Sequence, residues 1–171
     1  MNAQTPQSFE AEQEVLATCL IHPENMPWLS TQVQVADFWA GQHQVLWALF
    51  TECQEKHSTV DLVLLQQLAK DTGRWDACGG TRVIGEIMDR AGLSAHAGRY
   101  VSILKDKALQ RRVLDAAYSL DTVARDDDLD ADGRLAQVDA AIRHVFEGTA
   151  AQDLEHGGKG VREHHEIGAA A

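Results

Sequence analysis

Three glutamates crowd together near the N-terminus, where Glu10, Glu12 and Glu14 precede a run of apolar residues. Closely spaced carboxylates can act as an acid and a base, but such a pair needs a pocket and shifted pKa values, and nothing here indicates either. Pro6 is unsuited to a helix interior, and Ser8 is a favourable N-cap residue. Glu10 and Glu12 then fall in the first helical turn, where the helix dipole favours negative charge. We therefore interpret these carboxylates as the start of a helix.

A second acidic cluster has the spacing of a calcium-binding loop. Asp128, Asp130 and Asp132 take loop positions 1, 3 and 5, Gly133 takes position 6 and Asp139 takes position 12. Position 12 usually holds a bidentate glutamate, and no second loop accompanies this one. We therefore favour a solvated turn between two helices and keep weak calcium binding as the alternative.

The remaining candidates for chemistry do not complete a site. The stretch 157–160, Gly-Gly-Lys-Gly, is close to a phosphate-binding loop, but that loop would need Gly at 153 and Ser or Thr at 160, which are Asp153 and Gly160. His164 and His165 are neighbours on an expected helix and point about 100° apart, so they are poorly placed to chelate one ion. We predict no catalytic residue, no cofactor and no metal ligand in this chain.

Cysteines and tryptophans are interpreted as parts of the core. Cys19 and Cys53 lie on apolar helical faces, and the chain has no CxxC pair or Cys/His zinc pattern. Buried thiols of this kind indicate a reducing compartment. Tryptophan can stack on nucleic-acid bases, but few cations accompany the tryptophans here, so we expect core anchors instead. They are Trp28, Trp39, Trp47 and Trp75.

The composition excludes several functions. The chain has 171 residues, of which 44% are hydrophobic, and a formal net charge of −11. A surface this acidic repels phosphate backbones, so the chain alone should bind nucleic acid poorly and suits a basic partner better. No apolar run approaches the ~20 residues that cross a bilayer, and the N-terminus has no signal-peptide core. We expect no membrane association and a cytoplasmic location.

Helical periodicity dominates the sequence, and no stretch has the period of a strand, so we predict an all-α fold. Residues 1–93 are expected to form a globular head of short helices. Asp61 is the expected cap of one of them, and Thr72-Gly73 its end. The expected helices are Phe9–Ile21, a short helix ending near Gln32, Gln42–Lys56, Leu62–Asp71 and a helix after Gly79-Gly80 that stops at Gly92.

Two longer amphipathic helices are expected over residues 94–147, from Ser94 to about Arg125 and from about Arg134 to Glu147. Their apolar residues step by three and four: Leu109, Val113, Ala116, Leu120 and Val123, then Leu135, Val138, Ile142 and Val145. Such a pair forms an antiparallel hairpin around a tight acidic turn. Its stripe is too long for one partner helix to cover, so we expect a second protein chain against it. Residues 148–171 are a linker and the start of a linker helix.

Five short stretches resemble the N-terminal domain of bacterial replicative DNA helicases of the DnaB type. They are residues 8–16 (SFEAEQEVL), 37–39 (DFW), 60–65 (VDLVLL), Gly79-Gly80 with Glu86-Ile87, and 100–107 (YVSILKDK) followed by Arg111. Their order, their spacing and the change from globule to hairpin make the resemblance specific over about residues 6–147. Residues 160–171 resemble the start of the family's linker helix.

The resemblance implies assembly and docking, not catalysis. Similar domains pair through the helical hairpin and build a collar, a trimer of dimers, above a hexameric ring. The collar receives primase, and the helicase loader engages the region near the linker helix. ATP, Mg²⁺ and DNA bind the family's RecA-like motor domain, which is absent from this sequence. The sequence departs from the family's pattern in two places. Residues 91–98 lack the usual Pro-Ser/Thr and Ala-Asn pattern, and the turn 126–133 is more acidic than is usual in the family.

We therefore predict the collar domain of a replicative helicase, with no enzymatic activity of its own. A stand-alone adaptor, loader or inhibitor with a helicase-like collar is the alternative. The residues expected to contact a second copy or another partner are Arg111, Arg112, Tyr118, Leu120, Val123, Leu135, Val138, Ile142 and Phe146.

Overall fold

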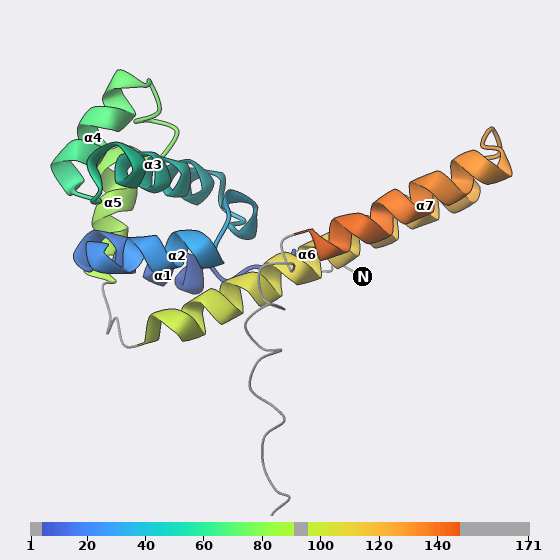
Figure 1. The fold of residues 1–171 in the computed structure, drawn as a ribbon, viewed down its shortest axis with the longest axis horizontal. Helices are drawn as coiled ribbons and strands as arrows, with labels where there is room; N and C mark the ends of the chain where they lie inside the picture. Colours follow the sequence, from blue (N-terminus) through green and yellow to red (C-terminus); the bar gives the residue numbers. More distant parts are fainter. Residues whose placement is uncertain (1–4, 91–95, 148–171) are drawn as a thin grey trace, which may run out of the picture.

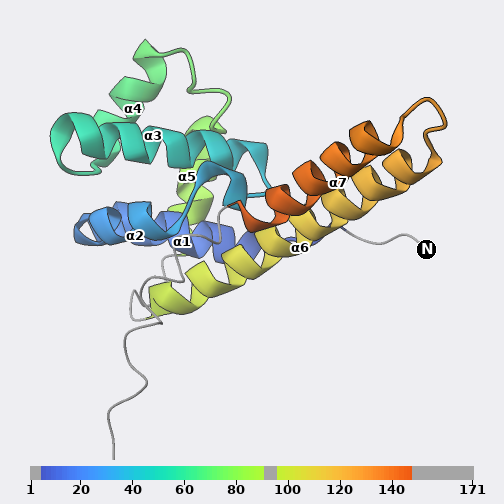
Figure 2. The ribbon, with the colours of Figure 1, turned by 45° about the vertical axis from the view of Figure 1, so that its right-hand side comes forward.

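The computed structural model describes residues 5–90 and 96–147, and its regular elements in those ranges are all helical. They are α1 (Phe9–Ile21), α2 (Met26–Gln32), α3 (Gly41–His57), α4 (Leu62–Asp71), α5 (Gly80–Asp89), α6 (Ala97–Arg125) and α7 (Ala131–Phe146), with the single-turn helices η1 (Pro23–Asn25) and η2 (Val35–Asp37). Helices α1–α5 form the head, and α6 with α7 forms a projecting hairpin (Figure 1; Figure 2). The predicted all-α fold is confirmed.

Local capping explains where the first helices begin. The Ser8 hydroxyl oxygen accepts a hydrogen bond from the Ala11 N–H at 3.3 Å, as expected for an N-cap. In α4, the Asp61 carboxylate accepts from the Val63 N–H at 2.8 Å and caps the helix in the same way. Gly73, with φ of +66°, then follows the end of α4 in the left-handed conformation that glycine adopts without strain.

The head closes a core of its own around α3. Trp47 and Phe50 of α3 are almost completely buried, and the Trp47 ring lies 5.4 Å from the ring of Phe38. Leu16 of α1 and Leu65 of α4 are fully buried in the same cluster, and α2 and α5 contribute to it as well. Every α-helix of the head therefore buries apolar side chains within the single chain.

The thiols fit this closed core, but two of the tryptophans do not. Cys19, Cys53 and Cys78 are all buried and free, and burial raises the pKa of the Cys19 and Cys53 thiols. Trp28 and Trp39 are each 43% exposed, so the prediction that all four tryptophans are core anchors is wrong for these two. They lie on or beside short surface helices, where neighbouring apolar residues already take the inward positions.

The hairpin is longer than any element of the head. Helix α6 has 29 residues, and its first half buries Val101, Leu104 and Ala108 against the head. Helix α7 begins at Ala131 instead of near Arg134, because the Asp130 carboxylate caps it by accepting from the Gly133 N–H at 2.8 Å. In the head, α5 ends at Asp89, before the expected stop at Gly92.

Several expectations fall outside the described residues. These are the Ser94 cap, the glycine-rich stretch 157–160, the pair His164-His165 and the linker residues 148–171.

Candidate protein interaction surface

The outer surface of the hairpin keeps large apolar side chains exposed. Helix α7 has no buried residue along its length, and its Leu135 and Ile142 are 68% and 47% exposed. On α6, Tyr118 and Val113 are 70% and 49% exposed. Large apolar side chains exposed along two packed helices are typical of a surface that another protein covers.

Packing between the two helices accounts for this exposure. Ala116 and Val123 of α6 are buried along the length over which α7 packs, and Val138 of α7 is half-buried. A helix contacts one neighbour along a single stripe of ridges and grooves. Leu135 and Ile142 are seven residues apart and share the outer edge of the apolar face of α7, so α6 does not cover them.

The residues predicted to contact a partner fall into four groups. Tyr118, Leu135, Ile142 and Phe146 are exposed, Leu120 and Val138 are half-buried, Val123 is buried, and Arg111 and Arg112 turn toward the head. Val123, at 5% exposure, packs within the hairpin and offers no contact surface in the single chain. The structure thus brings only part of the predicted set onto the outer surface of the hairpin.

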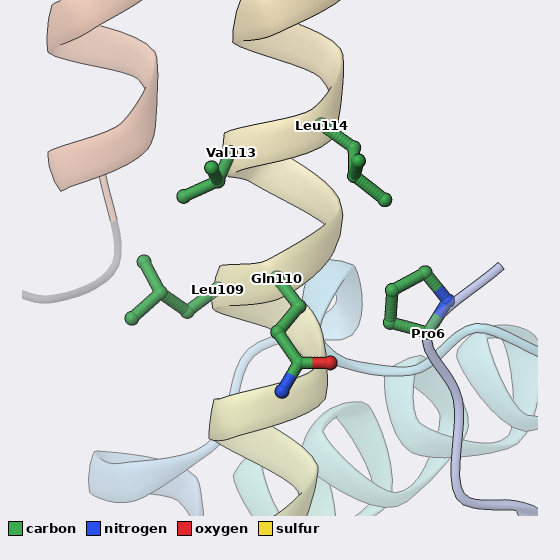
Figure 3. A pocket seen from close by; sticks show the side chains of 5 residues that line it. All are labelled: Pro6, Leu109, Gln110, Val113 and Leu114. Atoms are coloured by element: carbon green, nitrogen blue, oxygen red, sulfur yellow. The ribbon is translucent and has the colours of Figure 1, made fainter. Parts of the chain in front are cut away.

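An open apolar groove extends this surface toward the head. It has a volume of about 420 Å³ and is lined by Pro6, Leu109, Gln110, Val113 and Leu114 (Figure 3). Pro6 comes from the segment before α1, and the other residues come from successive turns of α6. Sequence periodicity already placed Leu109 and Val113 on the apolar stripe, but it gave no sign that the N-terminal segment crosses α6 beside them.

At the tip, an arginine binds backbone oxygens of the turn. The Arg134 guanidinium donates to the carbonyl oxygens of Val123, of Asp126 at 2.7 Å and of Leu129 at 3.1 Å. Carbonyls at the end of a helix lack partners within that helix and are favourable acceptors for a cation. A side chain of the chain itself therefore supplies positive charge to this acidic turn.

Two of the four aspartates of the calcium alternative have partners within the chain. Asp130 caps α7, and Asp139 forms an ion pair with Arg143 one turn further along the same helix. Across residues 5–90 and 96–147, no three His, Cys, Asp or Glu side chains are grouped so that they could hold a metal ion. Asp130 therefore acts as the helix cap in this turn, and weak calcium binding stays the alternative prediction.

One residue of the first acidic cluster has a role that sequence reasoning missed. Glu12 is 1% exposed, and its carboxylate accepts from the Trp39 N–H at 2.7 Å and the Ala40 N–H at 3.3 Å. It also lies 2.7 Å from Nδ1 of His43, which is fully buried. First-turn stabilisation therefore describes the exposed Glu10 but not Glu12, which ties α1 to the corner between η2 and α3.

A helical head with its own core and a projecting hairpin that exposes apolar side chains define an all-α helical domain. In the part of the chain that the structure describes, no helix is long and apolar enough to cross a membrane. The chain belongs to the family of DnaB-like helicase N-terminal domains, whose family model matches residues 4–106.

Individual relatives agree with this assignment. The chain is similar to the replicative DNA helicase DnaB of Rhodothermus marinus, with 30% identity over 80% of this chain and 14% of that protein. It is 27% identical to the DnaB of Geobacillus stearothermophilus, over 83% of this chain and 31% of the relative. The chain thus spans less than a third of the length of these relatives, and the matched part contains no motor domain.

A solved structure shows the same fold. The crystal structure of the N-terminal domain of DnaB helicase from Mycobacterium tuberculosis superimposes with a TM-score of 0.72 at 23% identity. The match covers 84% of this chain and 99% of that one. Head and hairpin are therefore shared with a DnaB N-terminal domain.

Proposed function

We propose that this chain is the collar domain of a replicative DNA helicase and that its own activity is self-association through the α6–α7 hairpin. The observation that carries the proposal is α7, a helix with an apolar face and no buried residue. Helices of this length gain most of their stability from packing an apolar face, so a second copy placed against α7 would supply the missing contacts. In the family such pairing builds a trimer of dimers.

The collar would also receive primase and the helicase loader and act in DNA replication in the cytoplasm. The relatives described above are replicative DNA helicases, which supports a role in DNA replication. ATP, Mg²⁺ and DNA would be bound by the motor domain of the full-length protein, and the chain itself would catalyse nothing. Cosedimentation with purified primase, and separately with the loader, tests each docking claim.

Sedimentation analysis of the 171-residue chain over a wide concentration range tests self-association. We expect the mass to rise with concentration for the wild type and to stay monomeric for Leu135→Asp and Ile142→Asp. Val63→Asp is the matched control, because Val63 is a similar apolar residue that is 72% exposed on the head. A strict monomer at high concentration, or an equal loss in the control, would count against the hairpin as the interface.

A further inference from the structure

Arg111 joins α6 to two separate segments of the head. Its guanidinium donates to the carbonyl oxygen of Pro6 at 3.1 Å, of Ala36 at 3.3 Å and of Asp37 at 2.6 Å. Pro6 precedes α1, whereas Ala36 and Asp37 are the last residues of η2. One side chain of α6 therefore binds two segments that lie 74 to 105 residues away from it in sequence.

The chemistry of this contact needs arginine. The last carbonyls of a helix have no partner within that helix, and the end of η2 presents two of them to Arg111. A planar guanidinium carries five N–H donors in a fixed fork, whereas a lysine offers one compact ammonium group. Burial lowers the pKa of Arg111, while the nearby carboxylates of Glu12 and Asp37 act in the opposite direction. An arginine remains charged under such conditions.

The corner that Arg111 binds is fixed from other sides as well. Arg112 places its guanidinium 3.7 Å from the Asp37 carboxylate, which in turn accepts from the Gln34 N–H at 2.9 Å. Immediately after the corner, the backbone N–H groups of Trp39 and Ala40 donate to Glu12 of α1. The corner cannot shift relative to α1 without breaking these bonds, so it gives Arg111 a rigid anchor.

Because of the position of Arg111 along α6, a small change in the angle of the helix there would move the tip of the hairpin by several ångström. Arg111 lies near the middle of α6, further along the helix than Val101, Leu104 and Ala108, which are buried against the head. Figure 2 shows that α6 continues past the head alongside α7. The rest of α6 extends about 20 Å further at 1.5 Å per residue. A tilt of about 10° at this point would move the tip by roughly 4 Å.

We propose that Arg111 is a positioning residue that sets the direction in which the hairpin leaves the head. The apolar contacts of α6 hold the helix against the head, and Arg111 fixes its angle by binding the N-terminal segment and the η2 corner together. The inference goes beyond self-association. If the hairpins pair as proposed above, Arg111 also determines where each head points in the assembly.

Distance measurement between paired spin labels tests this proposal on the full 171-residue chain. Labels at Val63→Cys on α4 and Gln137→Cys on α7 occupy exposed positions, and the native cysteines are buried and should not react. Dilution with unlabelled chain removes distances between molecules, so the result does not depend on self-association. We expect one narrow distance in the wild type, a distribution at least twice as wide in Arg111→Met, and an intermediate width in Arg111→Lys.

Two controls separate positioning from general destabilisation. Arg125→Met removes another α6 arginine, which pairs only with Asp121 one turn away among the described contacts, and should leave the width unchanged. Ile87→Ala weakens the head core in α5, a helix that carries neither label, and should also leave the width unchanged. A wild-type width in folded Arg111→Met would overturn the proposal. If Arg111→Met fails to fold, a wild-type width in Arg111→Lys would overturn it equally.

Discussion

The head and the hairpin have the same helical spacing of apolar residues, but they differ in how far these residues are buried. In the head, α3 alone buries Leu46, Trp47, Leu49, Phe50 and Cys53, because helices surround it on several sides. In the hairpin, α7 has an equally regular apolar face and buries no residue. The difference lies in the number of neighbours, since a single partner helix covers one stripe only. The head thus buries a core of its own, whereas the hairpin leaves large apolar side chains of α7 exposed.

The largest effect that separates the two regions is expected in the core of the head. Phe50→Ala removes a fully buried ring from α3 and should lower the free energy of unfolding by about 3–5 kcal/mol. Ile142→Ala on the half-exposed face of α7 should change it by less than ~1 kcal/mol in dilute solution. Chemical denaturation measures both variants, and similar losses would remove the contrast between the regions.

The next largest effect concerns the buried carboxylate. Glu12→Ala leaves the N–H groups of Trp39 and Ala40 and the ring of His43 without their acceptor, so we expect a loss of about 3 kcal/mol. Glu10→Ala, in the same helical turn but exposed, should cost less than ~1 kcal/mol. Equal losses in the two variants would mean that the dipole of α1, and not the link to the corner, determines the role of Glu12.

The smallest effect is a pH dependence confined to the head. Hydrogen bonds from Arg74 and Lys56 hold the pKa of Glu52 below its usual value. A carboxyl whose pKa is depressed by folding adds stability above its unfolded pKa of about 4.3, and this contribution disappears as the pH falls through the lower folded pKa. Glu52→Gln should therefore be slightly less stable than the wild type near neutral pH, and the two should converge in acid. Denaturation midpoints across the acid range that remain parallel would contradict this.

Most of the fold could be predicted from the sequence because its determinants are local. Ser8 and Asp61 cap their helices through residues two or three positions away, and the spacing of apolar residues marks the helices themselves. The predicted start of α7 was wrong by a few residues, because Asp130, one of several neighbouring aspartates, provides the cap of this helix.

The sequence did not predict the contacts of polar side chains whose partners lie far along the chain. Glu12 binds groups 27 to 31 residues away, and Arg111 binds carbonyls even further along the chain. A signal was present nonetheless, since Glu12 lies on the same helical face as Val15, Leu16 and Cys19. A charged residue on an apolar stripe indicates a buried polar contact, although only the fold identifies its partner.

Hydrogen exchange measured as a function of protein concentration tests the central claim most directly, because it reports on both regions at once. In dilute solution, the amides of α7 should exchange much faster than those of α3. On concentration, α7 and the outer half of α6 should become protected while α3 remains unchanged. Exchange in α7 that is as slow as in α3 in dilute solution, or that does not respond to concentration, would contradict a hairpin whose surface is completed by a second chain.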